Sequence, residues 1–313
     1  MTTQPTQEHT YENLLFDSQR WAQFKPRDSD VIVCTSYKAG TTWTQMMCAL
    51  LIHQTPDLPA PLGELSPWLD MNLEPIDRLI EGYEAQATRR VIKTHTPLDG
   101  LPYFENVSYV YCGRDPRDVF MSLQNHLANA DMERALSLMA DQGIEVEPPP
   151  PLPDDVHDRF KLWITTPTFD WEHDGLPYWS HFHHAETFWR HRRLPNIQFL
   201  HFADLKADLD GEMRKLARFL ETDVDESIWP ALVKAATFDE MKANADRTAP
   251  DTNHGIWRST SQFFNKGENE QWRSTLSDED MKLYESLTRE HYDLTMVDGL
   301  ERGSAAVGHP KDL

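Results

Sequence analysis

The chain has 313 residues, of which 39% are hydrophobic and 26% charged, and a formal net charge of -21. This negative charge disfavours binding to nucleic acid or to an anionic membrane, because both partners require a positively charged surface. A composition that includes 10 Trp is typical of a globular protein rather than a disordered one. Because α/β proteins of this length often fold as one unit, we expect a single domain over residues 1–313.

The N-terminal residues and the cysteines indicate a cytoplasmic protein. The stretch from Met1 to Tyr11 is polar and lacks the apolar core of a signal peptide, and no apolar run is long enough to span a membrane. The cysteines, Cys34, Cys48 and Cys112, are odd in number and lack the spacing of metal ligands. We therefore expect a reducing compartment and no insertion into a membrane.

The first predicted strand, Val31–Cys34, leads through a short loop to a predicted helix over Trp43–His53. The loop contains Lys38-Ala39-Gly40-Thr41-Thr42, and a glycine before a helix N-terminus allows the backbone to surround an anion. A Walker A loop ends in Gly-Lys-Ser/Thr, whereas here the lysine precedes the glycine. The pattern therefore indicates either a phosphate-binding loop that is not of the ATPase type or an ordinary strand-to-helix turn.

The second predicted strand, Arg90–Lys93, is followed directly by Thr94-His95-Thr96-Pro97. His95 would therefore lie at the carboxyl edge of the sheet, beside the phosphate-binding loop if the two strands are neighbours. An imidazole titrates near neutral pH and can remove a proton from a hydroxyl group. We expect His95 to be a general base, with Lys93 beside it.

The third predicted strand, Val107–Cys112, leads into Gly113-Arg114 and a helix that Asp115 caps and Pro116 opens. Ser122 follows Arg114 by about two helical turns, so both side chains can reach one phosphate group. The alternative for these two residue types is a surface arginine and a solvated helix serine.

The middle of the chain is irregular and rich in aromatic residues. The five prolines between Gly143 and Asp155 predict a surface loop. The segment from Phe160 to Trp189 is either a lid over an apolar pocket or a set of helices that bury their aromatic side chains in the core. We expect a loop or lid insertion around residues 128–180.

A last strand is predicted over Ile197–Phe202, followed by a helix over Leu209–Leu220. Strands and helices thus alternate along the chain. This alternation predicts an α/β fold with a mainly parallel central sheet flanked by helices, in which ligands bind beyond the carboxyl ends of the strands.

Two other functions are compatible with parts of the sequence. A small-molecule kinase would use the same phosphate-binding loop with ATP, although the position of the lysine argues against it. A metal-binding or interaction protein would use His181, His183, His184 and His191, of which His181 and His184 lie one helical turn apart.

Taken together and in order, the motifs resemble those of the cytosolic-type sulfotransferases, which use 3′-phosphoadenosine 5′-phosphosulfate (PAPS). The similarity spans most of the chain. The matching motifs are Lys38-Ala39-Gly40-Thr41-Thr42-Trp43, Lys93-Thr94-His95, Arg114-Asp115-Pro116-Arg117-Asp118 with Ser122, Thr237-Phe238, and Lys266-Gly267 with Trp272. The resemblance implies a P-loop-like donor site and the release of adenosine 3′,5′-bisphosphate (PAP).

The resemblance also assigns roles to these residues. The 5′-phosphosulfate of the donor would be bound by Lys38, Gly40, Thr41 and Thr42. The 3′-phosphate would be bound by Arg114, Ser122, Lys266 and Gly267. Trp43 and Phe238 would flank the adenine, with Thr237 in the same cofactor-binding motif.

Catalysis, by the same resemblance, would use His95 as general base, with Lys93 assisting beside the transferred group. Lys38 would neutralise the leaving phosphate, so that lysine carries the charge in place of a metal ion. The acceptor would be a small molecule with a hydroxyl group. The aromatic segment favours an apolar or aromatic acceptor, and steroids, lipid alcohols and phenolics all fit that description.

The sequence departs from the family pattern at several positions. Tyr37 replaces a usual proline, Ala39 a usual serine and Phe202 a frequent tyrosine. Asn265 replaces the arginine that normally precedes Lys266-Gly267, which implies weaker binding of the 3′-phosphate, and Glu270-Gln271 replace a usual Gly-Asp. The dimerisation motif of the family is not recognisable in Arg273–Lys282, so no oligomeric state is inferred.

Overall fold

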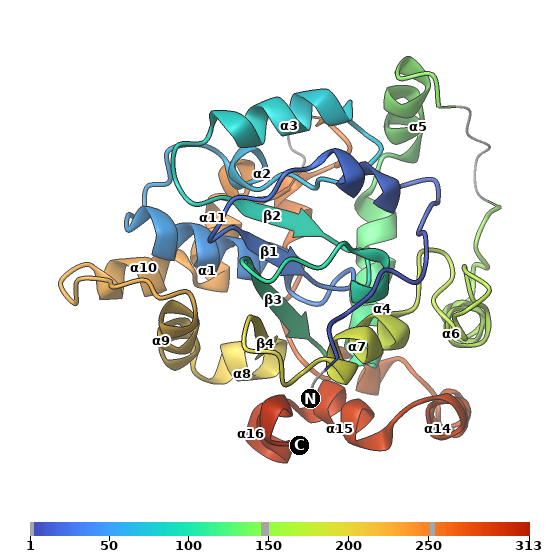
Figure 1. Cartoon of the computed structure of the whole chain (residues 1–313). Helices are drawn as coiled ribbons and strands as arrows, with labels where there is room; N and C mark the ends of the chain where they lie inside the picture. Colours follow the sequence, from blue (N-terminus) through green and yellow to red (C-terminus); the bar gives the residue numbers. More distant parts are fainter. Residues whose placement is uncertain (1–2, 145–149, 251–253) are drawn as a thin grey trace.

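A parallel β-sheet forms the centre of the computed structural model, which describes residues 3–144, 150–250 and 254–313 (Figure 1). The strands of the described sheet are β1 (Val31–Cys34), β2 (Val91–Thr94), β3 (Ser108–Gly113) and β4 (Ile197–His201), in the order β2-β1-β3-β4. Every pair of neighbouring strands in this sheet is parallel. The α/β fold expected from the alternation of strands and helices is therefore confirmed.

Because the strands are parallel, the loops that follow β1, β2 and β3 all leave the same edge of the sheet. The register pairs Cys34 of β1 with Thr94 of β2 and with Tyr111 of β3. The first residues after these strands carry the lysine, histidine and arginine motifs of the sequence. The position of β1 between β2 and β3 places the Lys38 loop in the middle of this edge.

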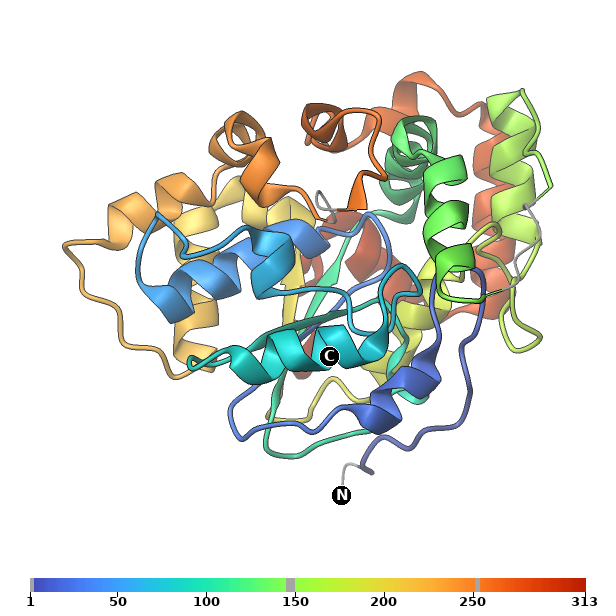
Figure 2. The same ribbon diagram turned by 90° about the horizontal axis from the view of Figure 1, so that it is seen from above.

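The two faces of the sheet are covered by different helices, and alternate residues of each strand point to each face. Val31 and Val33 of β1 contact one apolar cluster, which includes side chains of α1 (Thr41–His53), α9 (Leu209–Phe219) and α10 (Trp229–Ala235). Ile32 and Cys34 contact the other cluster, which includes side chains of α4 (Pro116–Asn129), α7 (His181–Arg190) and α14 (Asp278–His291). Figure 2 shows the helices distributed around the sheet in a second view.

The helix ends agree with the cap residues of the sequence, with one correction. Asp115 caps α4 by accepting a hydrogen bond from the backbone N–H of Arg117 at 2.9 Å, and Pro116 is the first helical residue, as predicted. Helix α1 begins at Thr41 rather than at Trp43. The reason is that Gly40, with φ 104°, completes the loop in a left-handed conformation and Thr41 and Thr42 already belong to the helix.

The remaining helices surround this core. They are η1 (Ser18–Gln23), α2 (Leu62–Leu65), α3 (Ile76–Ala85), η2 (Leu98–Gly100), α5 (Met132–Asp141), α6 (Val156–Thr165), α8 (Phe202–Ala207), α11 (Phe238–Ala243), α12 (Ala245–Thr248), α13 (Thr260–Phe263), η4 (Gln271–Ser274), α15 (Leu294–Arg302), α16 (Ser304–Val307) and η5 (Pro310–Asp312). Among the described residues, no helix combines the length and the apolar character that crossing a membrane requires.

The aromatic segment contributes both to the core and to a cavity. Phe160, Trp163 and Phe188 are buried in the cluster on one face of the sheet, as one of the two alternatives for this segment predicted. Tyr178 and Trp179 belong to the same cluster but also line the cavity described below. Part of the loop expected between Gly143 and Asp155, residues 145–149, lies outside the described residues.

Candidate active site

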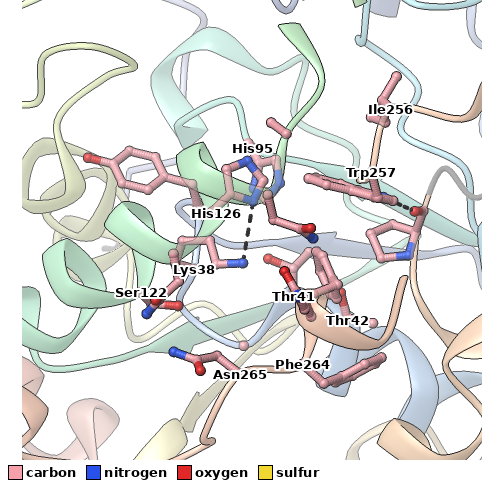
Figure 3. Close-up of a pocket in the computed structure, with 18 of the residues that line it drawn as sticks. Lys38, Thr41, Thr42, His95, Ser122, His126, Ile256, Trp257, Phe264 and Asn265 are labelled. Atoms are coloured by element: carbon pink, nitrogen blue, oxygen red, sulfur yellow. Dashed lines mark hydrogen bonds between the residues drawn. The ribbon is translucent and has the colours of Figure 1, made fainter. Parts of the chain in front are cut away.

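A cavity opens at the carboxyl edge of the sheet, where the loops after β1, β2 and β3 meet (Figure 3). Its wall contains most of the residues that the sequence motifs singled out. These residues are Lys38, Gly40, Thr41, Thr42, Trp43, Lys93, His95, Arg114, Ser122, Phe238, Lys266 and Gly267. The structure thus brings together motifs that are spread over more than 200 residues of sequence.

Thr237 is the member of the predicted set that does not line this cavity. Its hydroxyl group donates a hydrogen bond to the carbonyl oxygen of Lys234 at 2.8 Å and accepts one from the backbone N–H of Glu240 at 3.4 Å. Thr237 is therefore the N-cap of α11. Its contribution is to fix the start of the helix that presents Phe238 to the cavity.

The loop between β1 and α1 has the backbone of an anion-binding site. Lys38 and Gly40 both have positive φ angles, 59° and 104°, and a side chain at position 40 would press against Phe202 and Cys112 at 3.3 Å. The N-cap of α1 makes no side-chain hydrogen bond, so the first N–H groups of the helix remain available. Such N–H groups, together with the helix dipole, favour an anionic group such as a phosphate.

The ammonium group of Lys38 lies inside the cavity, among aromatic and basic side chains. Its Nζ atom is 3.5 Å from Nδ1 of His126 and 4.5 Å from the ring centroid of Phe263. Burial, together with the positive charges of Arg114 and Lys93, lowers the pKa of Lys38 to about 7. A bound anion would reverse this effect because it stabilises the charged form.

His95 lies next to this loop and its protonation state follows from its hydrogen bond. Nδ1 of His95 is 2.6 Å from the carbonyl oxygen of Thr35, which can only accept, so Nδ1 carries the proton. Nε2 is then the unprotonated nitrogen. Burial lowers the pKa of His95 well below its ordinary value, with further lowering by the charges of Lys93 and Lys38, so the ring is neutral at pH 7. The geometry supplies a free base at the edge of the cavity.

The residues on either side of His95 are held by the buried carboxylate of Asp70, which the sequence analysis did not single out. Oδ2 of Asp70 accepts hydrogen bonds from the hydroxyl groups of Thr94 at 2.7 Å and Thr96 at 2.6 Å. Asp70 is fully buried, and burial raises its pKa while these hydrogen bonds lower it. On the cavity side, the ring of Trp68 contacts His95 edge to face and lies 4.9 Å from Nζ of Lys93.

Arg114 connects the loop after β1 with the loop that carries Lys266 and Gly267. Its guanidinium donates hydrogen bonds to the carbonyl oxygens of Lys38 at 2.9 Å and Glu268 at 3.2 Å, and it lies 4.1 Å above the ring of Phe202. Nε of Arg114 is buried and has no hydrogen-bond partner among the described residues. A buried cation with an unused donor fits an anionic ligand.

The loop that carries Lys266 and Gly267 is held in place by Asp118 of α4. The two carboxylate oxygens of Asp118 accept hydrogen bonds from the backbone N–H groups of Glu270 at 2.7 Å and Gln271 at 2.8 Å. Gly267 has φ 63°, and a Cβ there would lie 2.6 Å from the ring of Phe238. Asp118 therefore ties this loop to α4.

The adenine-binding pair implied by the resemblance also reaches the cavity. Trp43 is oriented by a hydrogen bond from its indole Nε1 to the carbonyl oxygen of Ala236 at 2.7 Å, and its ring contacts Phe202 edge to face. Phe238 follows two residues after Ala236 and lies on the same wall. The chain between α10 and α11 thus positions both rings.

The other end of the cavity is mostly apolar and contains residues that sequence reasoning missed. Besides Trp68, Tyr178 and Trp179, it is lined by Leu15, Met71, Leu73, Ala135, Ile256 and Trp257. His126 also lines this end, and its place four residues after Ser122 on α4 is the one signal that would have indicated it. Tyr37, the residue in place of a usual proline, contacts Tyr178 and Trp179 and accepts a hydrogen bond from the indole of Trp163.

The four histidines of the metal-binding alternative have separate surroundings. His181 donates a hydrogen bond to the carbonyl oxygen of Arg114, His183 contacts Asp99 at 2.9 Å and His191 donates to the carbonyl oxygen of Thr3. His184 stacks on Phe188 instead. The described structure therefore does not bring these four rings to one ion.

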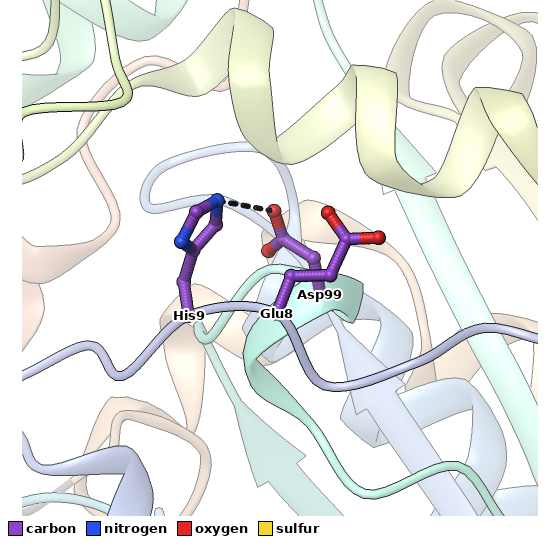
Figure 4. A group of neighbouring side chains, drawn as sticks. All are labelled: Glu8, His9 and Asp99. Atoms are coloured by element: carbon purple, nitrogen blue, oxygen red, sulfur yellow. Dashed lines mark ion pairs between the residues drawn. The ribbon is translucent and has the colours of Figure 1, made fainter.

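A different group of side chains in the described residues has ligand atoms close together, namely Glu8, His9 and Asp99 (Figure 4). Both carboxylate oxygens of Asp99 already contact protein, since Oδ1 accepts from the hydroxyl of Tyr11 at 2.9 Å and Oδ2 contacts His183. The backbone N–H of Glu8 also donates to the carbonyl oxygen of Asp99. These contacts fasten the N-terminal segment to the loop after β2.

Comparison with known proteins gives a consistent result for almost the whole chain. A family model described as a sulfotransferase domain matches residues 28–296. The glycolipid sulfotransferase of Mycobacterium bovis (strain BCG / Pasteur 1173P2) is 36% identical over 294 residues, which cover 89% of this chain and 90% of the relative. Sulfotransferase 1C2 of Homo sapiens is 25% identical over 289 residues, 88% of each protein.

Solved structures show the same fold. Mouse sulfotransferase SULT7A1 complexed with PAP superimposes with a TM-score of 0.65 at 19% identity, covering 88% of this chain and 90% of that one. A retinol dehydratase in complex with retinol and PAP gives a TM-score of 0.66 at 22% identity, covering 88% of this chain and 85% of that one. No feature of the cavity or of these matches favours the kinase alternative.

Proposed function

Because the chain belongs to the sulfotransferase family and is a PAPS-dependent sulfotransferase, we propose that it transfers the sulfuryl group of PAPS to a hydroxyl group of a small, apolar or aromatic acceptor. The observation that carries this proposal is that Lys38 and the unprotonated Nε2 of His95 belong to one cavity. A charge-stabilising cation and a base are the two groups that sulfuryl transfer to an alcohol requires.

At the donor end, the proposed ligands are groups that favour anions. Lys38, Gly40, Thr41 and Thr42 bind the 5′-phosphosulfate, and Arg114, Ser122, Lys266 and Gly267 bind the 3′-phosphate. The unused Nε of Arg114 and the positive φ angles of Gly40 and Gly267 support this assignment. Trp43 and Phe238 flank the adenine, while Thr237 acts only through the helix it caps.

In the proposed reaction, Nε2 of His95 takes the proton of the acceptor hydroxyl as its oxygen forms the new bond to sulfur. The bond between sulfur and the bridging phosphate oxygen breaks, and the electron pair remains on PAP. Lys38 neutralises the charge that grows on that oxygen, and Lys93 stabilises the oxygens of the transferred group. Positioning and charge stabilisation supply most of the catalysis in such loose transfers, so these residues need no metal ion.

At the acceptor end, the apolar wall favours a molecule with a hydrophobic body. The segment of residues 128–180, which we interpret as the acceptor-side insertion, contributes Asn129, Met132, Ala135, Tyr178 and Trp179 to the wall. The relatives named as glycolipid sulfotransferases indicate that an amphipathic acceptor is within the range of this family. We place the enzyme in the cytoplasm, which agrees with the three free, buried cysteines.

Calorimetric titration tests the donor assignment. The purified protein is titrated with PAP and, in parallel, with ATP and Mg²⁺. Binding of PAP that is much tighter than that of ATP is the expected result, and sulfuryl transfer from PAPS to a panel of alcohols and phenols then tests the acceptor. A preference for ATP with Mg²⁺ would overturn the proposal in favour of the kinase.

A further inference from the structure

A second histidine, His126, lies at the reacting end of the cavity and has no role in the function proposed above. It belongs to α4, four residues after Ser122, and its ring contacts Trp257 and Tyr178 edge to face, with centroids 5.0 Å and 6.1 Å away. Figure 3 shows Nζ of Lys38 directed at the His126 ring, with His95 nearby. His126 is thus a polar group in a predominantly apolar wall.

The proton of the His126 ring is located by its neighbour. Burial and the charges of Lys38 and Lys93 lower the pKa of His126 well below its ordinary value, so the ring is neutral. With an anionic donor bound, Lys38 is an ammonium group, which can only donate, and therefore Nδ1 of His126, 3.5 Å from Nζ of Lys38, is the accepting nitrogen. The proton is then on Nε2, for which the described residues provide no hydrogen-bond partner.

The two histidines of the cavity therefore offer opposite groups. His95 presents an accepting nitrogen, because its Nδ1–H is used by Thr35, whereas His126 presents a donating N–H, because its Nδ1 is used by Lys38. The reacting hydroxyl donates its proton to His95 and uses a lone pair of its oxygen to attack sulfur, so a hydrogen bond from His126 to that same oxygen would lower its nucleophilicity. An alcohol with a second oxygen beside the reacting hydroxyl can accept a hydrogen bond from His126 at the same time.

We propose that His126 is a specificity-determining residue that binds, through Nε2–H, a second oxygen adjacent to the reacting hydroxyl, so that the preferred acceptors are vicinal diols and sugar head groups on an apolar body. This inference rests on the proposed function. The apolar wall formed by Leu15, Met71 and Leu73 accounts for the body of such an acceptor. A site built to hydrogen-bond a substrate oxygen discriminates strongly against an analogue that lacks it, because its polar group is left unpaired.

The test compares two acceptors that differ by one oxygen, 1,2-octanediol and 1-octanol, with PAPS as donor. The measured quantity is the ratio of their kcat/KM values. The wild-type enzyme is expected to prefer the diol, and His126→Phe, which keeps the contacts with Trp257 and Tyr178, is expected to reduce the ratio about tenfold or more. His126→Gln, which retains an N–H donor, is expected to restore part of the preference.

His157→Phe is the matched control, because this half-buried histidine pairs with Asp280 outside the cavity, and it should leave the ratio unchanged. The inference is overturned if the wild-type enzyme does not prefer the diol. It is also overturned if His126→Phe changes both kcat/KM values by the same factor, because His126 would then act only through its contact with Lys38. Failure of the proposed function would be seen separately, as the absence of PAP binding in the calorimetric titration.

Discussion

Nδ1 of His95 lies 2.6 Å from the carbonyl oxygen of Thr35, a residue that immediately follows the neighbouring strand β1. The carbonyl oxygen accepts the Nδ1 proton and so leaves Nε2 as the basic nitrogen. The same contact fixes the orientation of the ring against Trp68. The backbone of the loop after β1 therefore selects the tautomer that a general base needs.

Replacement of this base should stop the reaction without removing the donor. His95→Ala is expected to reduce kcat by about 10²- to 10⁴-fold, the usual contribution of a general base. The dissociation constant for PAP, measured by calorimetry, should change little because the ring does not contact the predicted donor ligands. Normal turnover in this variant would remove His95 from the mechanism.

The protonation state of His95 can be followed directly by NMR titration of the ligand-free protein. Burial and the nearby charge of Lys93 lower its pKa, so its ring should stay neutral until the pH is well below 6.5. His157 is the internal contrast, since its hydrogen bond to Asp280 raises its pKa. Lys93→Met should move the titration of His95 to higher pH, and no movement would mean that Lys93 does not act on the ring.

Binding of PAP should be coupled to the uptake of a proton by Lys38. In the ligand-free protein this pKa is about 7, so at pH 8 the amine is mostly neutral, whereas an anionic ligand favours the ammonium form. Titrations at pH 8 in two buffers of different ionisation enthalpy should show about one proton more taken up by the wild type than by Lys38→Met. At pH 6 the amine is already charged and the difference should vanish; a difference that persists there would contradict the assignment.

The anchoring of the Lys266 loop by Asp118 predicts a defect in donor binding. Asp118→Asn puts an amide NH₂ where one backbone N–H of Glu270 or Gln271 now donates, and so leaves a hydrogen bond unmade. A loss of about 1–3 kcal/mol corresponds to a KM for PAPS raised by roughly 5- to 150-fold, with a smaller change in kcat. Asp298→Asn, in a surface ion pair with Arg302, is the control. An unchanged KM would show that the loop is held without Asp118.

Asn265 stands where the family pattern has an arginine, so restoring an arginine at this position should raise the affinity for PAP. Asn265 lines the cavity beside Lys266. Its backbone carbonyl oxygen accepts a hydrogen bond from the ammonium group of Lys242. Asn265→Arg adds a guanidinium that can bind the 3′-phosphate, so the affinity for PAP should rise about tenfold at low salt and less at high salt. The affinity for AMP, which lacks the 3′-phosphate, should not rise. An equal gain for both ligands would indicate a general charge effect instead.

Much of the fold and of the candidate site could be predicted from the sequence, because the signals are local. Asp115 and Pro116 specify the start of α4 by capping and by a fixed φ angle. Short apolar runs followed by Lys38, His95 and Arg114 place these residues at strand ends, and parallel strands bring such ends to one edge. The sequence pattern predicts the start of α1 two residues late, because the role of Gly40 as the last loop residue depends on its backbone conformation.

What the sequence by itself determined is the family, the parallel α/β architecture and the residues that the donor motifs contain, since each depends on residues close together in the chain. What only the tertiary structure decided is how distant residues act on them. Lys38 contacts His126, which lies 88 positions away in the sequence. Asp118 accepts a hydrogen bond from Glu270, 152 positions away. Thr35 fixes the tautomer of His95, 60 positions away. These contacts leave no local pattern, because they are created by packing of the folded chain, and they position the residues that line the cavity.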